Sequence, residues 1–424
     1  MKRLLFSTLF VLTAIAGWAQ TTFTEGNFTY TVTDEENHEV SIAKAAEASL
    51  TGALVIPSSV TYEAVTYAVT AVGDEGFNGT GITSVTVPAS VMTIGIAAFQ
   101  GCGSLASITI EDSETPLTMP GAWYERPFIE NSATTFYIGR NLTLTGGENY
   151  PLTYNATSVE FGPKVTTINP SLFYTNYKLA SITIGSGVTT IGESAFLACG
   201  QSDEVTETVV TMGSNVTSIG TNAFKDCTHI KSVTLPSKLT TIGNEAFGNS
   251  GLTSISIPAS VTSIGIAAFQ GCNSMTSITI EDSETPLTIS GAWYERSFWN
   301  GATTIYIGRD LTLDGGENNP LLYEATNVEF GPKVTTINPA LFYSNSKLAS
   351  IIIGNGVTTI GESAFNGCGT YWNEETNQGV EELVVTMGNN VTSIGANAFL
   401  NCSKLKSITL SSKLTTIGSE AFQQ

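Results

Sequence analysis

The fold of this chain is decided by a stretch that reads, from residue 252 to residue 272, LTSISIPASVTSIGIAAFQGC. Its first part alternates between apolar and polar residues: Leu252, Ile255 and Ile257 face inward, and the serines between them face outward. This is the period-two pattern of a strand with one buried face. Pro258 ends the strand because it has no backbone donor.

The second part of the stretch turns the chain back. Val261 and Ile264 return it along the core, and Gly265 permits a tight turn. We expect the segment that follows to be one short helical turn, with Phe269 inserted into the core and Cys272 three residues later.

The motif Ile-Gly-x-x-Ala-Phe recurs along almost the whole chain. It ends at Phe99, Phe196, Phe224, Phe247, Phe269, Phe365, Phe399 and Phe422, with looser copies at Phe77, Phe173 and Phe342. A period of about 20–29 residues is typical of a solenoid, whose coils must stack because none can bury its apolar stripe alone. We therefore predict a curved leucine-rich repeat solenoid of about fifteen coils over residues 53–424. It should carry a parallel β-sheet on its concave face and short helical turns and loops on its convex face.

The full repeat, Leu-x-Ser-Ile-Thr-Ile-Pro-x-x-Val-Thr-x-Ile-Gly-x-x-Ala-Phe-x-x-Cys, resembles that of BspA-type leucine-rich repeat proteins over roughly residues 53–424. The resemblance implies a bacterial protein that is secreted or held at the cell surface. It also implies adhesion to host or neighbouring-cell surface proteins, including extracellular matrix components. The motif is specific for the fold and much less so for the ligand.

A longer duplication overlies the short repeat. Residues 82–250 match residues 252–424, so that Ile94 to Phe99 returns as Ile264 to Phe269. The chain thus carries two copies of a cassette of about seven coils. Any special surface on one copy should appear on the other.

The two ends differ from the repeats. Residues 1–19 have the basic start, short apolar run and small cleavage-site residues of a secretory signal peptide. The run is too short for a comfortable membrane span, so we expect an exported protein without direct membrane insertion. Residues 20–52 alternate as strands do and are expected to form an N-terminal β cap on the first coil. The sequence stops inside a coil at Gln424, and an uncapped edge there would allow self-association.

The formal net charge of −20 bears on the class of partner. It argues against nucleic acid, because phosphate binding needs Lys and Arg. It also argues against docking on anionic lipid. Solubility outside the cell is the simplest reason for the acidity.

The cysteines occupy one fixed place in the repeat, three residues after a Phe. They are Cys102, Cys199, Cys227, Cys272, Cys368 and Cys402. One small residue per coil at a constant position favours buried free thiols over a disulfide framework. Cys199 with Cys227, and Cys368 with Cys402, are expected on consecutive coils, so a bridge in an oxidising compartment stays open as the alternative.

Two segments break the repeat in the same way. Gly121-Ala122-Trp123-Tyr124-Glu125-Arg126 recurs as Gly291 to Arg296. Aromatic rings with an Arg are the residue types that anchor protein or glycan partners. The candidate ligand-binding residues of these breaks are Trp123, Tyr124, Arg126, Trp293, Tyr294 and Arg296. The alternative is that both tryptophans fill the core of a coil that lacks its usual Phe.

The outward positions of the predicted sheet are mostly threonine, which suits a parallel ladder in its own right. One Tyr and one Glu interrupt the threonines in each cassette. These four residues complete the candidate ligand-binding set: Tyr137, Glu160, Tyr306 and Glu329.

Signals for catalysis are weak. The only histidines are His38 and His229, in unrelated settings, and there is no serine nucleophile motif, phosphate loop or histidine metal pair. Glu111 and Asp112 have the oxygens that calcium prefers, but their spacing fits a solvated acidic turn better. We therefore expect no enzyme activity, no cofactor and no metal.

The sequence as a whole predicts an exported, non-enzymatic protein that holds an extracellular protein or glycan on its repeat surface. A structural spacer or assembly element is the first alternative, and glycan capture for nutrient uptake is the second. Neither the ligand nor the means of retention at the cell surface follows from the sequence.

Overall fold

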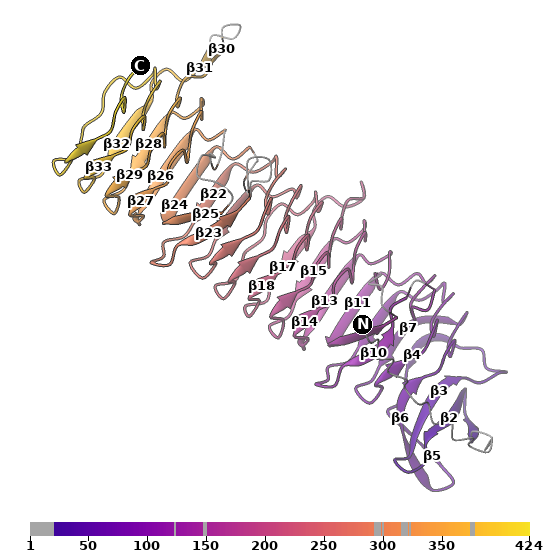
Figure 1. The fold of residues 1–424 in the computed structure, drawn as a ribbon. Coiled ribbons are helices and arrows are strands. Elements are labelled where there is room, and N and C mark those ends of the chain that lie inside the picture. The colour runs from indigo at the N-terminus through magenta and orange to yellow at the C-terminus, as the bar shows by residue number, and fades with distance from the viewer. Residues whose placement is uncertain are drawn as a thin grey trace, which may run out of the picture.

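The structure, a computed structural model, describes residues 21–122, 124–146, 151–291, 298, 301–314, 321, 324–373 and 378–424. They form a parallel β-solenoid of about 13 turns, which Figure 1 shows as one elongated stack. Each turn therefore packs against the turns before and after it along the axis. The predicted signal peptide, residues 1–19, lies outside the described residues.

One wall of the solenoid consists of two sheets with seven and six parallel strands, thirteen in all. We call it the long-strand wall, and its strands are β4 (Thr51–Val55), β7 (Gly81–Val87), β9 (Ser107–Ile110), β11 (Thr135–Arg140), β13 (Ser158–Lys164), β15 (Ser181–Ile184), β17 (Val209–Thr211), β20 (Ser254–Ile257), β22 (Ser277–Ile280), β24 (Thr304–Arg309), β26 (Asn327–Lys333), β28 (Ser350–Ile353) and β32 (Val384–Met387). The repeat copies at 231–236 and 406–411 are described but contribute no strand, and a single bridge joins Ile408 to Val385. The repeat predicted about fifteen coils, and the wall has thirteen strands because these two copies form none.

A second wall, the short-strand wall, was not expected as a sheet. Its strands are β3 (Glu39–Lys44), β6 (Val65–Val72), β8 (Thr93–Ile94), β10 (Leu117–Pro120), β12 (Leu142–Thr145), β14 (Thr167–Ile168), β16 (Thr190–Ile191), β18 (Ser218–Ile219), β19 (Thr241–Ile242), β21 (Ser263–Ile264), β23 (Leu287–Ser290), β25 (Leu311–Asp314), β27 (Thr336–Ile337), β29 (Thr359–Ile360), β33 (Ser393–Ile394) and β34 (Thr416–Ile417). Most of them are the Thr-Ile or Ser-Ile pair that precedes the repeat Gly, paired in register with the next turn.

The N-terminal end and one late segment depart from this pattern. Strands β1 (Thr22–Glu25), β2 (Phe28–Asp34) and β3 form an antiparallel meander, and β3 continues into the short-strand wall by parallel pairing with β6. Strand β5 (Ser59–Tyr62) pairs antiparallel with β6. A hairpin of β30 (Trp372–Asn373) and β31 (Gln378–Gly379) projects from the stack near its C-terminal end (Figure 1).

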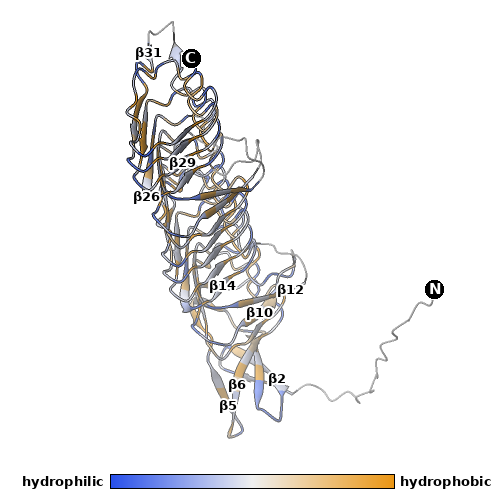
Figure 2. Ribbon diagram, turned by 60° about the vertical axis from the view of Figure 1, so that its left-hand side comes forward, coloured by the Kyte–Doolittle hydropathy of each residue, from blue (hydrophilic) through white to orange (hydrophobic). Residues whose placement is uncertain are grey.

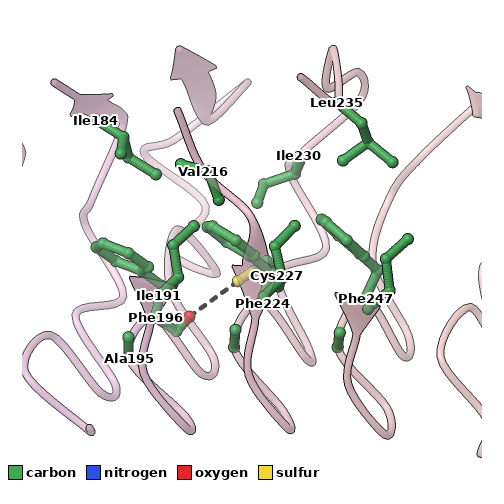
Figure 3. Packing of buried hydrophobic residues seen from close by; sticks show 14 of the residues in the cluster. Ile184, Ile191, Ala195, Phe196, Val216, Phe224, Cys227, Ile230, Leu235 and Phe247 are labelled. Carbon is green, nitrogen blue, oxygen red and sulfur yellow. Dashed lines mark hydrogen bonds between the residues drawn. The ribbon is translucent and has the colours of Figure 1, made fainter. Parts of the chain in front are cut away.

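The core lies between the walls and runs the length of the stack. On the long-strand wall, Ile108, Phe136, Val159 and Ile182 are register neighbours on four successive strands, and all four are buried. Figure 3 shows how such side chains from successive turns point into the same space, and Figure 2 shows apolar strands recurring along the rod. The alternation in the sequence thus builds one continuous apolar core, as predicted.

Phenylalanine rings of the repeat form a column through this core. Neighbouring rings lie parallel, with centroids 5.2–6.0 Å apart. Phe128 and Phe298 belong to the column, so the expectation that their turns lack a Phe is wrong. In the turns that follow, Leu152 and Leu321 are buried at the corresponding place and donate their amides to the next turn as the phenylalanines do.

The predicted helical turns do not form: the described residues contain no helix. The residue two positions before the Phe takes a left-handed conformation, with φ of 57° at Asn222 and 51° at Glu245, and this breaks a right-handed helix. The amide of Phe224 donates to the carbonyl of Ala246 on the next turn at 2.7 Å instead. The predicted curvature of the solenoid was argued from bulky helical turns on one face. Because those turns do not form, that argument no longer supports the curvature.

None of the described residues forms a helix able to span a membrane.

All six cysteines are buried with free thiols, which confirms that prediction. Each thiol donates to the carbonyl of the Phe one turn earlier; Cys227 Sγ lies 3.0 Å from Phe196 O (Figure 3), and Cys199 Sγ lies 3.1 Å from Phe173 O. The thiols therefore point at backbone oxygens. This explains why the pairs on consecutive turns are not bridged.

Candidate functional site

The long-strand wall carries the predicted Tyr–Glu pair once in each cassette. Tyr137 on β11 is the register neighbour of Glu160 on β13, and Tyr306 on β24 is the register neighbour of Glu329 on β26. Both Glu side chains are exposed and both Tyr side chains are partly exposed. The structure therefore brings each predicted pair together on an outward face.

Each of these tyrosines is also tied to the turn before it. Tyr137 Oη donates to Asp112 Oδ1 at 2.8 Å, and Tyr306 Oη donates to Asp282 Oδ1 at 2.7 Å. Burial is the main cause that raises the pKa of Tyr137 to about 12, with the bond to Asp112 second. The hydroxyl is thus a neutral donor at physiological pH, and the ring is held in one place on the wall.

Two glycines make room for this bond. A Cβ on Gly139 would lie 2.6 Å from Asp112 Oδ1, and a Cβ on Gly162 would lie 2.5 Å from the same oxygen and 2.6 Å from Tyr137 Oη. These separations are shorter than any real contact of a Cβ, so only glycine fits. The glycines of two repeated segments, Ile-Gly-Arg at the end of β11 and Phe-Gly-Pro-Lys at the end of β13, are therefore needed for the position of the tyrosine.

The acidic turn behind the tyrosine is structural. Glu111 Oε2 accepts the amide of Ala89 at 3.1 Å, and Asp112 accepts the hydroxyl of Tyr137. Glu114 pairs with Lys164 at 2.6 Å on the surface. Across the described part of the chain, no group of three or more His, Cys, Asp or Glu side chains is arranged to hold a metal ion.

A buried arginine that the sequence reasoning missed lies at the end of the same strand. Arg140 is 0% exposed, and its guanidinium donates to the carbonyls of Pro88 (2.6 Å), Val91 (2.8 Å) and Ala89 (3.1 Å). Burial lowers the pKa of Arg140, and Glu111 opposes this shift. Its counterpart in the second cassette, Arg309, makes the same three bonds to the equivalent loop. The only sequence signal was the duplicated Ile-Gly-Arg at a strand end.

The aromatic break lies elsewhere. Tyr124 is 80% exposed, whereas Arg126 is 3% exposed, donates to the carbonyl of Pro151 and has its guanidinium carbon 5.5 Å from the centroid of the Tyr154 ring. Arg126 therefore packs against the following turn, and its side chain is buried rather than exposed on the surface. Four further candidates lie outside the described residues: Trp123, Trp293, Tyr294 and Arg296.

Tyr124 and Arg126 line a hollow of about 270 Å³. A second hollow of about 490 Å³ lies beside it and shares Tyr154 and Asn155 with it. Its other lining residues, Tyr177, Lys178, Gln201, Ser202 and Asp203, come from the next turns. We call the two hollows together the edge groove.

The edge groove and the acidic turn behind Tyr137 lie at opposite ends of the strands. The residues of the groove precede the strands β11, β13, β15 and β17, whereas Asp112, the partner of Tyr137, follows strand β9. The two groups of candidates are therefore separate surfaces.

The comparisons place the chain in a family. The model of the BspA type leucine rich repeat region matches residues 70–202, 201–297 and 376–424, with six copies, which is more than half of the 424 residues. The chain belongs to this family of leucine-rich repeat proteins. No curated protein sequence matches it significantly.

Several solved structures are similar to the chain at low identity. A leucine-rich repeat protein from Bacteroides ovatus is 21% identical, with 95% of this chain and 91% of that chain covered and a TM-score of 0.41. A leucine rich cell surface protein from Faecalibacterium prausnitzii is 20% identical, with 94% of each chain covered and a TM-score of 0.33. The pneumococcal vaccine antigen PcpA is 13% identical, with 94% and 98% covered and a TM-score of 0.31.

Proposed function

We propose that this chain is an exported, non-enzymatic, adhesin-like protein that binds an extracellular protein or glycan on the long-strand wall. The observation that carries the proposal is the Tyr–Glu pair, which occurs once per cassette at the same register. Membership of the BspA-type repeat family supports a role at or beyond the cell surface.

The chemistry of the pair suits recognition. A tyrosine ring locked by its bond to Asp112 loses little side-chain entropy when a partner packs on it, and tyrosine is enriched among residues that dominate interfaces. The exposed carboxylate of Glu160 beside it adds a charge that selects a complementary donor. Ordered threonines on the neighbouring strands, such as Thr109 and Thr183, extend the flat contact surface.

Two equivalent pairs on one rod would act together on a multivalent partner. Linking two sites raises the overall affinity by roughly 10²–10⁴-fold over one site when both can bind at once. The rod holds Tyr137 and Tyr306 at a constant separation, because the stacked turns between them share one continuous core. We therefore expect tight binding to matrix fibres or cell surfaces and weak binding to a single soluble copy of the ligand.

The test uses the full chain against immobilised extracellular matrix proteins and whole host cells, by surface plasmon resonance and cell-binding assays. Glu160→Thr and Glu329→Thr place a threonine at each Glu position. The register neighbour of Glu160 on the next strand is already a threonine, Thr183, so the wall should stay folded. Each single variant should lose the avidity and weaken binding by about tenfold or more, and the double variant should abolish it.

Thr183→Ser is the matched control on the same column and should bind as the parent does. Thermal unfolding of every variant checks that the solenoid is intact. If the double variant binds every tested surface as strongly as the parent, the long-strand wall is not the binding surface. The spacer alternative would then be the better account of the repeat surface.

A further inference from the structure

The edge groove of the first cassette has a chemistry that the proposed function does not use. Two exposed tyrosines line it, Tyr154 at 39% and Tyr177 at 49% exposed. Each stands four residues before a strand, and the first residues of those strands, Ser158 and Ser181, pair in register. The two side chains therefore come from equivalent places on adjacent turns, roughly 4.8 Å apart along the rod.

The charges that line the groove cancel. Arg126 and Glu130 line one hollow, and Lys178 and Asp203 line the other. Arg126 is buried on the carbonyl of Pro151, and Lys178 is paired with Glu204 at 3.0 Å. Because these two cations are balanced by two carboxylates, the lining has no net positive charge, and the groove does not favour a sialylated, sulfated or phosphorylated ligand.

Polar groups around the tyrosines have hydrogen-bonding capacity to offer. Asn155 donates its Nδ2 to Asn131 O at 2.9 Å, and its Oδ1 makes no hydrogen bond within the described part of the chain. Among the described residues, the hydroxyl of Tyr177 and the carboxylate of Asp203 also make no hydrogen bond. Exposed rings flanked by an amide oxygen, a carboxylate and a phenol match the alternating C–H faces and hydroxyl groups of a neutral sugar.

The second cassette differs at two of these places, those of Tyr177 and Asp203. Ser346 stands four residues before β28, in the place of Tyr177. Its carbonyl accepts the amide of Tyr371 at 3.0 Å, and in the first cassette the carbonyl of Tyr177 accepts the amide of Ser202 at 2.8 Å. Tyr371 therefore corresponds to Ser202, and the next residue, Trp372, stands in the place of Asp203. The inserted hairpin places these rings near cations: Lys347 Nζ lies 5.5 Å from the Tyr371 ring and Lys404 Nζ lies 5.1 Å from the Trp372 ring.

We infer that the edge groove binds a neutral oligosaccharide, and that each chain has one such site, in the first cassette. This inference starts from the binding function proposed above and assigns a ligand class to a different surface. Its stoichiometry also differs, because the Tyr–Glu pairs of the long-strand wall predict two sites per chain and the edge groove predicts one.

The test is isothermal titration calorimetry of the full chain with linear neutral hexasaccharides of glucose, mannose and xylose. Sialyllactose and hexalysine serve as anionic and cationic probes. We expect at least one neutral hexasaccharide to bind with one site per chain. Tyr177→Ser should weaken that binding by about tenfold or more, since it removes an exposed ring from the contact. Asp203→Ala should weaken it as well.

Tyr177→Ser copies the residue that the second cassette tolerates at this place, so its fold should be unaffected. Tyr371→Ser is the matched control in the second cassette and should leave saccharide binding unchanged. No binding of any neutral hexasaccharide, binding at two sites per chain, or binding indifferent to Tyr177→Ser would each overturn the inference. Tyr177-dependent binding of hexalysine alone would also overturn it, in favour of a cationic peptide. The surface-binding assay of the long-strand wall is independent, so its result stands whichever way this titration goes.

Discussion

Replacing the buried Arg140 by Ala should open the loop at residues 88–91 locally. The guanidinium makes three hydrogen bonds of 2.6–3.1 Å to carbonyls of that loop, from a side chain that is 0% exposed. A hydrogen bond to a charged group contributes about 1.5–3 kcal/mol, so the three give about 5–9 kcal/mol before the cost of burying the cation. Desolvation offsets several kcal/mol of this, which leaves a net loss of about 3–5 kcal/mol.

Amide hydrogen exchange measures this loss where it occurs. The amide of Val91 donates to the carbonyl of Pro88, which is itself an acceptor of Arg140, so it should exchange roughly one hundred to several thousand times faster in Arg140→Ala. The amide of Val261 in the second cassette is the internal control, because its loop is held by Arg309. Arg309→Ala should give the mirror-image result.

Arg140→Met separates packing from hydrogen bonding. It keeps most of the volume and removes the guanidinium donor from three carbonyls, of which those of Pro88 and Val91 are buried, so it should lose nearly as much protection as the Ala variant. The reasoning is refuted if Val91 changes by less than tenfold, if Val261 responds equally to Arg140→Ala, or if Met restores full protection.

Three further predictions follow from the core and the wall. Phe224→Ala should destabilise the solenoid by about 3–5 kcal/mol in urea unfolding, and Phe224→Leu by less, because Leu152 fills the same place naturally. The native thiols should not react with Ellman's reagent at pH 8, and all should react in denaturant, because burial raises the pKa of Cys227 to about 12 and that of Cys272 to about 11. Tyr306 should ionise near pH 12 in absorbance titrations at 295 nm. Its raised pKa favours the fold fully below the unfolded value of about 10, and this contribution should fade as pH rises through about 12; removal of the bond in Asp282→Ala should lower the Tyr306 pKa.

Several features of the site could be read from the sequence. Period-two alternation set which side of each strand faces the core, so the outward pairing of Tyr137 with Glu160 followed once the repeats were aligned. The duplication then predicted the second pair, Tyr306 with Glu329. The constant place of the cysteines correctly indicated buried thiols, although not their bonds to the phenylalanine carbonyls.

Other features depended on contacts between turns. The helical turns were wrong because the sequence Ala-Ala-Phe or Glu-Ala-Phe has good helix propensity, and hydrogen bonds to the next turn overrode it. The burial of Arg126 could not be read from the sequence: it was predicted as a ligand-binding residue beside aromatics, and the structure buries it on a carbonyl of the following turn.

By itself the sequence determined the solenoid, its apolar core and its duplication, because each of these depends on periodicity along one chain. Only the tertiary structure decided which surfaces are available. The Tyr137–Asp112 bond joins residues 25 apart, the Arg140 bonds join residues 49–52 apart, and the edge groove gathers side chains from several successive turns. Stacking turns a fixed sequence interval into a spatial contact, and insertions such as the hairpin at Trp372 alter that interval in ways that only the folded rod reveals.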